Sequence, residues 1–208
     1  MGPRMALKSA TLALTCLALL AGCGFLEKLT PRAGGQLAPI GQVSRAEIAK
    51  SGQPVMRLRV PSRGIDTFLT IRDRRGDVVN WFSADGMLFT FRNDVLIETR
   101  GLGADLMSSA APGAGQIAAG AGHRRAYFFV DDDDQTGRRD YLCRITTDGG
   151  EQLEIFGRGH NTRKVSETCE REIGRITNHY WLEGGKIRKS REWVSPGIGQ
   201  IEFERVID

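Results

Sequence analysis

The chain has 208 residues, of which 40% are hydrophobic and 26% are charged, a composition typical of a globular protein rather than a disordered one. Its formal net charge is +4, with 29 basic and 25 acidic residues, and the sequence contains no Lys/Arg-rich block. Nucleic-acid binding requires a dense positive surface, so this composition excludes that function class and we expect no nucleic-acid partner.

Residues 1–22 have the pattern of a secretory signal. Arg4 and Lys8 precede an uncharged stretch, residues 9–20, that is rich in Leu and Ala. This stretch is too short to cross a bilayer, which takes about 20 apolar residues. It is followed by Ala21, Gly22 and Cys23.

The segment Leu20-Ala21-Gly22-Cys23 resembles the lipobox of bacterial lipoproteins. The resemblance implies diacylglycerol on the Cys23 sulfur, cleavage before Cys23, and acylation, for example by palmitate, of the new N-terminus. Acyl chains of this kind hold a protein on a bilayer almost permanently. Residue 24 is Gly, and the absence of an Asp there favours the outer membrane, with the protein facing the periplasm. The alternative is an ordinary signal peptide that is cut elsewhere.

Processing before Cys23 would remove Cys16 and leave Cys143 and Cys169 as a pair in an oxidising compartment. We expect them to form a disulfide, the alternative being two buried thiols that never meet. The mature net charge would fall to about +2, because only Arg4 and Lys8 are lost. We therefore expect a signal peptide (1–22), a lipidated N-terminus with a flexible tether (23–43), and a single β domain (44–208).

Most of the domain alternates polar and apolar residues with the period of β-strands. Residues 44–47 fit a capping box, which predicts a short helix over 45–51. Tight turns are expected at 74–77, 84–86, 93–94, 147–150 and 183–185. Residues 103–122 break the pattern, and we expect a helical turn near 104–109 followed by a Gly/Ala-rich loop. The predicted strands are 55–60, 66–72, 78–83, 87–92, 95–99, 124–130, 138–147, 151–156, about 162–170, 173–182, 186–194 and 199–207.

The connections between these strands are too short for crossover helices, so the strands must pair in an antiparallel manner. The predicted fold class is all-β and mainly antiparallel, as a meandering barrel, a half-open barrel or a sandwich with one or two short helices. The alternation alone does not separate barrel from sandwich.

Few motifs point to chemistry. The Asp run 131–134 fits an EF-hand loop poorly, because Cys143 stands where a bidentate Glu is needed, and a solvated hairpin tip is the better interpretation. Residues 113–118 match G-x-G-x-x-A without the βαβ unit that this motif needs. His123, His160 and His179 are too scattered for a metal site. A G-x-S-x-G elbow is absent. We therefore predict no catalytic residues, no metal and no cofactor.

The most suggestive cluster lies near the C-terminus, where aromatic and cationic residues occupy neighbouring predicted strands. Aromatic faces and cationic donors can bind sugars and their acidic substituents, although strand aromatics are more often core residues. The candidate residues for glycan or partner binding are Tyr180, Trp181, Arg188, Arg191 and Trp193.

Two segments carry a family resemblance. Residues 178–204, which contain S-R-E-W-V-S-P, and residues 80–106, which contain T-R-G-L-G-A-D-L, look like the corresponding parts of the YjbF/GfcB family of group 4 capsule polysaccharide lipoproteins. Residues 164–170 also fit the family. The insert 110–122 has no counterpart, and only Cys23 transfers as a functional residue.

The resemblance implies a lipoprotein that assists exopolysaccharide or capsule assembly or secretion by binding a partner of the export machinery or the polysaccharide itself. Two alternatives stay open, a polysaccharide-modifying enzyme and a lipid or lipoprotein carrier built on a half-barrel.

Overall fold

The computed structural model describes residues 40, 43–130 and 135–208, which belong to one compact unit, Leu37–Asp208. The proposed lipid attachment at Cys23, the signal peptide and most of the tether lie outside the described residues. The Asp run 131–134 also lies outside them, between the two strands of a hairpin.

Twelve strands form one antiparallel sheet in the order β5-β4-β3-β2-β1-β12-β11-β10-β9-β8-β7-β6. Apart from the contact of β1 with β12, every pairing joins strands that follow each other in sequence, as a meander requires. The strands are β1 (Val55–Val60), β2 (Ile65–Arg75), β3 (Val78–Ser83), β4 (Leu88–Arg92), β5 (Val95–Arg100), β6 (Ser108–Ala110), β7 (His123–Val130), β8 (Thr136–Ile155), β9 (Arg158–Glu170), β10 (Arg175–Glu183), β11 (Lys186–Ser195) and β12 (Gly199–Ile207).

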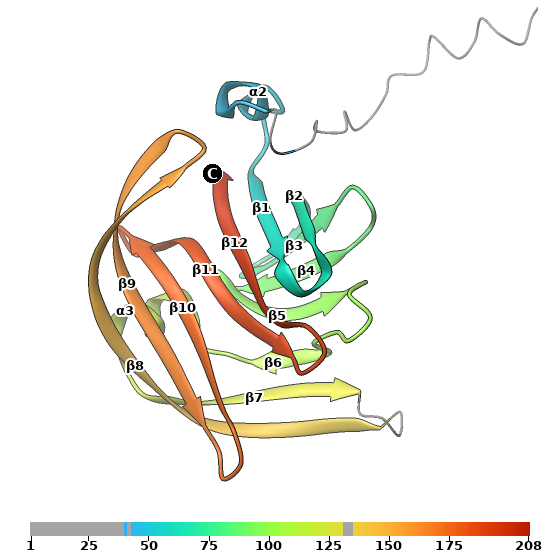
Figure 1. Cartoon of the computed structure of the whole chain (residues 1–208), viewed down its shortest axis with the longest axis vertical. Coiled ribbons are helices and arrows are strands. Elements are labelled where there is room, and N and C mark those ends of the chain that lie inside the picture. The colour runs from blue at the N-terminus through green and yellow to red at the C-terminus, as the bar shows by residue number, and fades with distance from the viewer. Residues whose placement is uncertain (1–39, 41–42, 131–134) are drawn as a thin grey trace, which may run out of the picture. The chain divides into compact units, whose positions relative to one another are not determined.

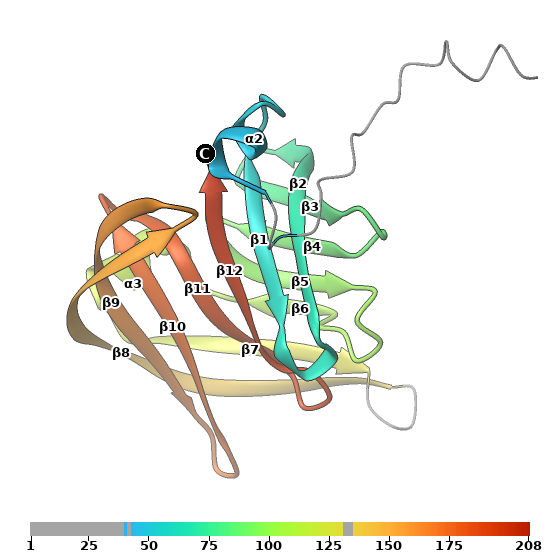
Figure 2. The same ribbon diagram turned by 45° about the horizontal axis from the view of Figure 1, so that its top comes forward.

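The sheet curls until its two edge strands approach each other, so the fold is a nearly closed barrel and not a sandwich (Figures 1 and 2). At the seam between β5 and β6, the Thr99 amide donates a hydrogen bond of 3.0 Å to the carbonyl of Leu106. This closure removes most of the exposed strand edge that an open sheet would present.

The barrel interior is filled by apolar side chains from alternate strand positions. In β1, Met56, Leu58 and Val60 are buried in the main core, whereas Arg57 and Arg59 point outward to Glu204 and Glu202 of β12. Phe203 packs edge-on against Phe89 and Phe91, with ring centroids 5.6 and 4.9 Å apart.

Two short helices complete the described unit. Helix α2 (Arg45–Ala49) has the predicted capping box between Ser44 and Glu47, and its Ile48 is fully buried against β1 and β12 residues. Helix α3 (Ala114–Ala119) buries Ile117 beside Val95, Val165 and Leu182, where it covers the seam of the barrel. None of the helices in the described part of the chain is long and apolar enough to span a membrane.

Two sequence predictions need correction. Residues 147–150 do not form a turn: β8 continues through them with a bulge, since Gly149 adopts a φ of +123°. The turn of this hairpin lies at Phe156 and Gly157 instead. The expected helical turn near 104–109 is a loop leading into β6, and the helix lies later, at α3.

Candidate functional site

The two segments that carry the family resemblance meet at one end of the barrel. The first forms the loop between β5 and β6, and its Asp105 carboxylate accepts hydrogen bonds from the Thr99 hydroxyl and the Gly101 and Leu102 amides. The Thr99 hydroxyl in turn accepts from the Leu106 amide. The conspicuous residues of T-x-G-L-x-x-D-L therefore hold this loop in a single conformation.

The second segment forms the turn between β11 and β12 and packs against that loop. The Ser195 hydroxyl donates to the carbonyl of Ala104. Gly197 lies so close to Ala104 that a side chain at residue 197 would come within 2.7 Å of the Ala104 Cβ. The Ser and Gly of this Ser-Pro-Gly sequence are thus explained by the close approach of the two segments.

A pocket of about 470 Å³ lies where these segments meet the ends of β7 and β8. The pocket lies at the end of the barrel away from α2. β12 starts at the turn that lines the pocket and ends beside α2, next to the start of β1 (Figure 1). The residues that line the pocket include Arg100, Asp105, Met107, Phe129, Val130, Arg139 and Ser195.

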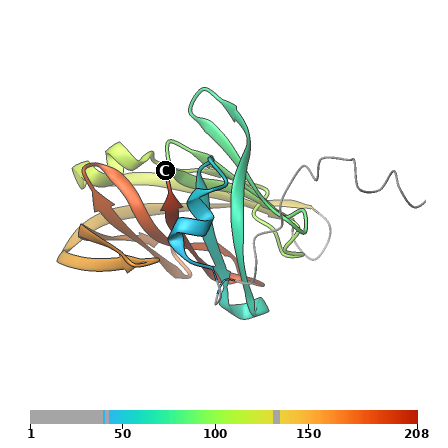
Figure 3. The ribbon, with the colours of Figure 1, turned by 90° about the horizontal axis from the view of Figure 1, so that it is seen from above.

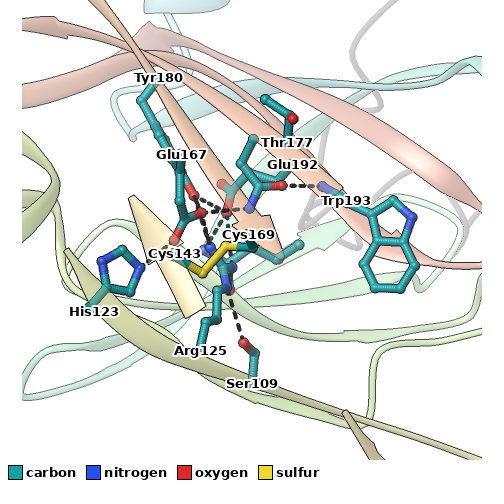
Figure 4. Close-up of polar contacts among 12 residues, drawn as sticks. Ser109, His123, Arg125, Cys143, Glu167, Cys169, Thr177, Tyr180, Glu192 and Trp193 are labelled. Atoms are coloured by element: carbon teal, nitrogen blue, oxygen red, sulfur yellow. Dashed lines mark hydrogen bonds and ion pairs between the residues drawn. A yellow bond between two sulfur atoms is a disulfide. The ribbon is translucent and has the colours of Figure 1, made fainter. Parts of the chain in front are cut away.

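Deeper in the barrel, charged and polar side chains from four strands form a fully buried cluster (Figure 4). Arg125 of β7 lies 2.6 Å from Glu167 of β9 and 3.7 Å from Glu192 of β11. The Tyr180 hydroxyl accepts from Arg125 and lies 3.2 and 3.3 Å from the two carboxylates. Asn178 donates to Glu167 and accepts from the Trp193 amide.

This cluster takes the place of a neighbouring strand along part of the seam. Leu96 of the edge strand β5 donates its amide to the Glu192 carboxylate at 3.4 Å, and its carbonyl accepts from Arg125 at 3.5 Å. Buried backbone groups must be hydrogen-bonded, and here the Glu192 and Arg125 side chains bond the Leu96 amide and carbonyl in place of a neighbouring strand.

The pKa values of the two buried carboxylates are shifted in opposite directions. Burial alone would raise the pKa of Glu167, but Arg125 and the hydrogen bonds from His123 and Asn178 lower it to about 2. Burial raises the pKa of Glu192 to about 6, because its Arg125 partner is farther away and does not compensate. Hydrogen bonding to Glu167 raises the pKa of His123.

The predicted disulfide is present beside this cluster. Cys143 of β8 and Cys169 of β9 are directly opposite each other in the sheet, 26 residues apart in sequence. His123, Cys143 and Glu167 bring their ligand atoms within 4.8 Å of one another, which the spacing of the histidines did not indicate. However, the Cys143 sulfur is bonded to Cys169 and the Glu167 carboxylate is paired with Arg125, so these two atoms are already engaged and do not serve as metal ligands.

The five residues expected to bind glycan do not share one surface. Tyr180 is fully buried in the charged cluster. Trp181 packs between the ammonium groups of Lys164 and Lys189. Arg188 is paired with Glu183 and Asp208, and Arg191 lies near Glu202. Trp193 packs edge-on against Tyr127 and Phe129, and Phe129 in turn lines the pocket.

Sequence reasoning missed Arg125, Glu167 and Arg139. A usable signal was present in β7 and β8, where Arg125 is in phase with Tyr127 and Phe129, and Arg139 with Tyr141 and Cys143. A charged residue in phase with core residues faces the interior or the mouth of a barrel.

Comparisons with known proteins identify a family and a similar fold. A family model described as "Group 4 capsule polysaccharide lipoprotein gfcB, YjbF" matches residues 36–206. The chain is similar to the crystal structure of the lipoprotein YmcC from Escherichia coli (K12), at 18% sequence identity and a TM-score of 0.70, covering all of this chain and 98% of that one. This likeness confirms the all-β fold.

A looser likeness is to an exported protein with a YmcC-like fold from Bacteroides fragilis, at 11% identity and a TM-score of 0.36, covering 74% of this chain and 93% of that one. The search of curated proteins finds no match.

Proposed function

Because the chain belongs to the YjbF family of group 4 capsule polysaccharide lipoproteins, we propose that it is an outer-membrane lipoprotein that assists exopolysaccharide or capsule export by holding the polymer in its barrel-end pocket. A lipid on Cys23 would retain it in the envelope, facing the periplasm, and proteins of the export machinery would be its neighbours.

The observation that carries this proposal is the convergence of both family segments on a single pocket. Asp105 braces the first loop, Ser195 joins the second loop to it, and the space where they meet has a volume within the range of roughly 300–1,000 Å³ that is usual for ligand sites. Its lining combines arginines with an aromatic ring, the combination that suits sugars with acidic substituents.

The carrier alternative finds less support in the structure. The core of the described barrel is filled by buried aromatic and aliphatic side chains such as Trp81, Phe89 and Tyr127, and the charged cluster lies among them. A lipid carrier needs an open apolar interior, which this packing does not leave.

The test is to delete the gene, restore it on a plasmid, and measure secreted polysaccharide. We expect polymer export to fall in the deletion strain and to recover on complementation. Unchanged export under inducing conditions would contradict the proposal. Incubating the purified mature lipoprotein with the polymer separates holding from catalysis: new reducing ends or shorter chains would establish an enzyme instead.

A further inference from the structure

We propose that the barrel opens locally along the seam between β5 and β6, and that loss of the proton from the Glu192 carboxyl favours this opening. The seam is then a pH-sensitive element of the barrel wall, which moves while the other strands stay paired. The inference is independent of the proposed function, because Glu192 and the groups around it do not line the barrel-end pocket.

The seam is the place where the two edge strands of the sheet meet without pairing. β5 pairs with β4 on one side, and the sheet order ends at its other side. Among the described residues, one backbone hydrogen bond joins β5 to the segment that leads into β6, from the Thr99 amide to the Leu106 carbonyl. A strand edge with so few backbone bonds can separate at a lower free-energy cost than a strand that pairs along its whole length.

The next part of the seam depends on two side chains. The Leu96 amide donates to the Glu192 carboxylate at 3.4 Å, and Arg125 donates to the Leu96 carbonyl at 3.5 Å. Both distances exceed the usual range of about 2.7–3.2 Å for N–H···O hydrogen bonds, so both bonds are weak. When the seam opens, water can take the place of both partners of the Leu96 backbone.

Glu192 is the group in the seam that gains most from water. Its Oε2 atom accepts from Leu96, contacts the Tyr180 hydroxyl at 3.3 Å and lies 3.7 Å from Arg125. Its Oε1 atom is buried and has no hydrogen-bond partner among the described residues. A buried carboxylate with an unsatisfied oxygen is far less favourable than a buried neutral carboxyl. Once Glu192 is charged, opening that admits water therefore stabilises it.

The groups that face Glu192 do not compensate its charge. Arg125 of β7 lies closer to Glu167 of β9, at 2.6 Å, and is balanced by it. The Tyr180 hydroxyl of β10 has one proton and can donate it to only one of the two carboxylates. His123 of β7, whose pKa is raised, is bonded to Glu167 at 2.6 Å. Burial accordingly raises the pKa of Glu192 to about 6.

The test measures amide hydrogen exchange by NMR in the mature lipoprotein, held in detergent, from pH 5 to pH 8. The Leu96 amide reports opening of the seam. The Leu58 amide reports unfolding of the whole barrel, because β1 pairs with a strand on each side. Protection factors remove the intrinsic pH dependence of exchange. We expect Leu96 to be protected at least about a hundredfold less than Leu58, since local opening costs less than global unfolding.

Two variants identify the controlling group. Glu192→Gln removes the ionisable proton and keeps an oxygen that can accept from Leu96. Its Leu96 protection, divided by that of the wild type, should rise about tenfold from pH 5 to pH 8, because only the wild type gains a charge at residue 192. This ratio cancels the titration of His123, which both proteins share. Glu98→Gln is the matched control, since it changes a carboxylate of β5 that is paired with Arg100 instead, and its ratio should stay constant.

The outcomes decide both parts of the inference. Equal protection of Leu96 and Leu58 in the wild type would show that the seam opens only when the whole barrel unfolds, and this comparison needs no variant. A constant ratio for Glu192→Gln, or an equal rise for Glu98→Gln, would exclude Glu192 as the controlling group. Amide chemical shifts that change only near the cluster would show that Glu192→Gln retains the fold.

Discussion

At the scale of single residues, the buried cluster assigns different roles to two carboxylates that look alike in the sequence. Glu167 lies 2.6 Å from Arg125 and also accepts from His123 and Asn178, so it carries the negative charge that balances the buried arginine. Glu192 lies farther away, and one of its oxygens is buried without a hydrogen-bond partner among the described residues. We expect mutations at the two positions to differ sharply.

Glu167→Gln should lower the free energy of unfolding at pH 7 by about 3 kcal/mol or more, because it leaves a buried arginine without its closest counterion. Glu192→Gln makes the same chemical change in the same cluster and should cost little, since this carboxylate is itself disfavoured when charged. Urea denaturation of both variants measures the difference. Equal losses at the two positions would contradict these roles.

The pH dependence of stability follows from Glu192. Burial raises its pKa from the usual value near 4.5 to about 6, with Arg125, Glu167 and Tyr180 as the groups that face it. Because the pKa of Glu192 is higher in the folded than in the unfolded protein, the free energy of unfolding has its full value below pH 4.5. It decreases as the pH rises through about 6. The loss amounts to about 2 kcal/mol at pH 7.

Denaturation at pH values from 4.5 to 8 measures this effect. As the pH rises over this range, the free energy of unfolding of Glu192→Gln should increase relative to that of the wild type by this amount. Comparing the two proteins at each pH cancels the titration of Glu167, whose lowered pKa of about 2 matters only below pH 4.5. A difference that does not vary with pH would exclude Glu192 as the titrating group.

At the scale of elements, the disulfide joins β8 and β9 at the charged cluster. Cys143 and Cys169 are direct cross-strand partners, and Glu167 lies two residues from Cys169. The bond closes a loop with a sequence separation of 26, which contains the long hairpin and its bulge at Gly149. Its effect is mainly to restrict the unfolded chain.

The double variant Cys143→Ser/Cys169→Ser should lose about 3 kcal/mol in the free energy of unfolding. Urea denaturation checks this, and the wild type unfolded in the presence of a thiol reductant should approach the same midpoint. A double variant that unfolds at the wild-type urea concentration would mean that the bond contributes nothing to stability.

At the scale of the whole molecule, the function that we propose depends on an anchor and a folded barrel. The anchor is a prediction from Leu20–Cys23, and the barrel ends in the pocket formed by the two family segments. Figure 3 shows the barrel from above, with α2 at the end where the described chain begins. Anchor and pocket can be tested separately.

Cys23→Ala should abolish labelling by radioactive palmitate and release the protein from the membrane fraction of gently broken cells, because no acyl chain remains to bind the bilayer. Cys16→Ala changes the cysteine within the signal peptide and should leave labelling and fractionation unchanged. A Cys23→Ala protein that still takes up palmitate would show that the lipid is attached elsewhere.

Much of the fold was readable from the sequence because its causes are local. The alternation in β1 placed Met56 and Leu58 inside, and the turn at Asn93 and Asp94 was recognisable because both residues accept a positive φ. The error at residues 147–150 arose because the same local sequence is compatible with two structures. Gly149 and Gly150 permit either a turn or a bulge, and the long pairing of β8 with β9 selects the bulge.

By itself, then, the sequence determined the all-β class, the helix at Ser44 and the family, since each depends on residues that are near in sequence or few in number. Only the tertiary structure decided that the sheet closes, and that Arg125 and Glu192 seal its seam while Arg139 faces a pocket. These features join strands that are far apart in sequence, and the periodicity within one strand does not show which residues of other strands its side chains will meet.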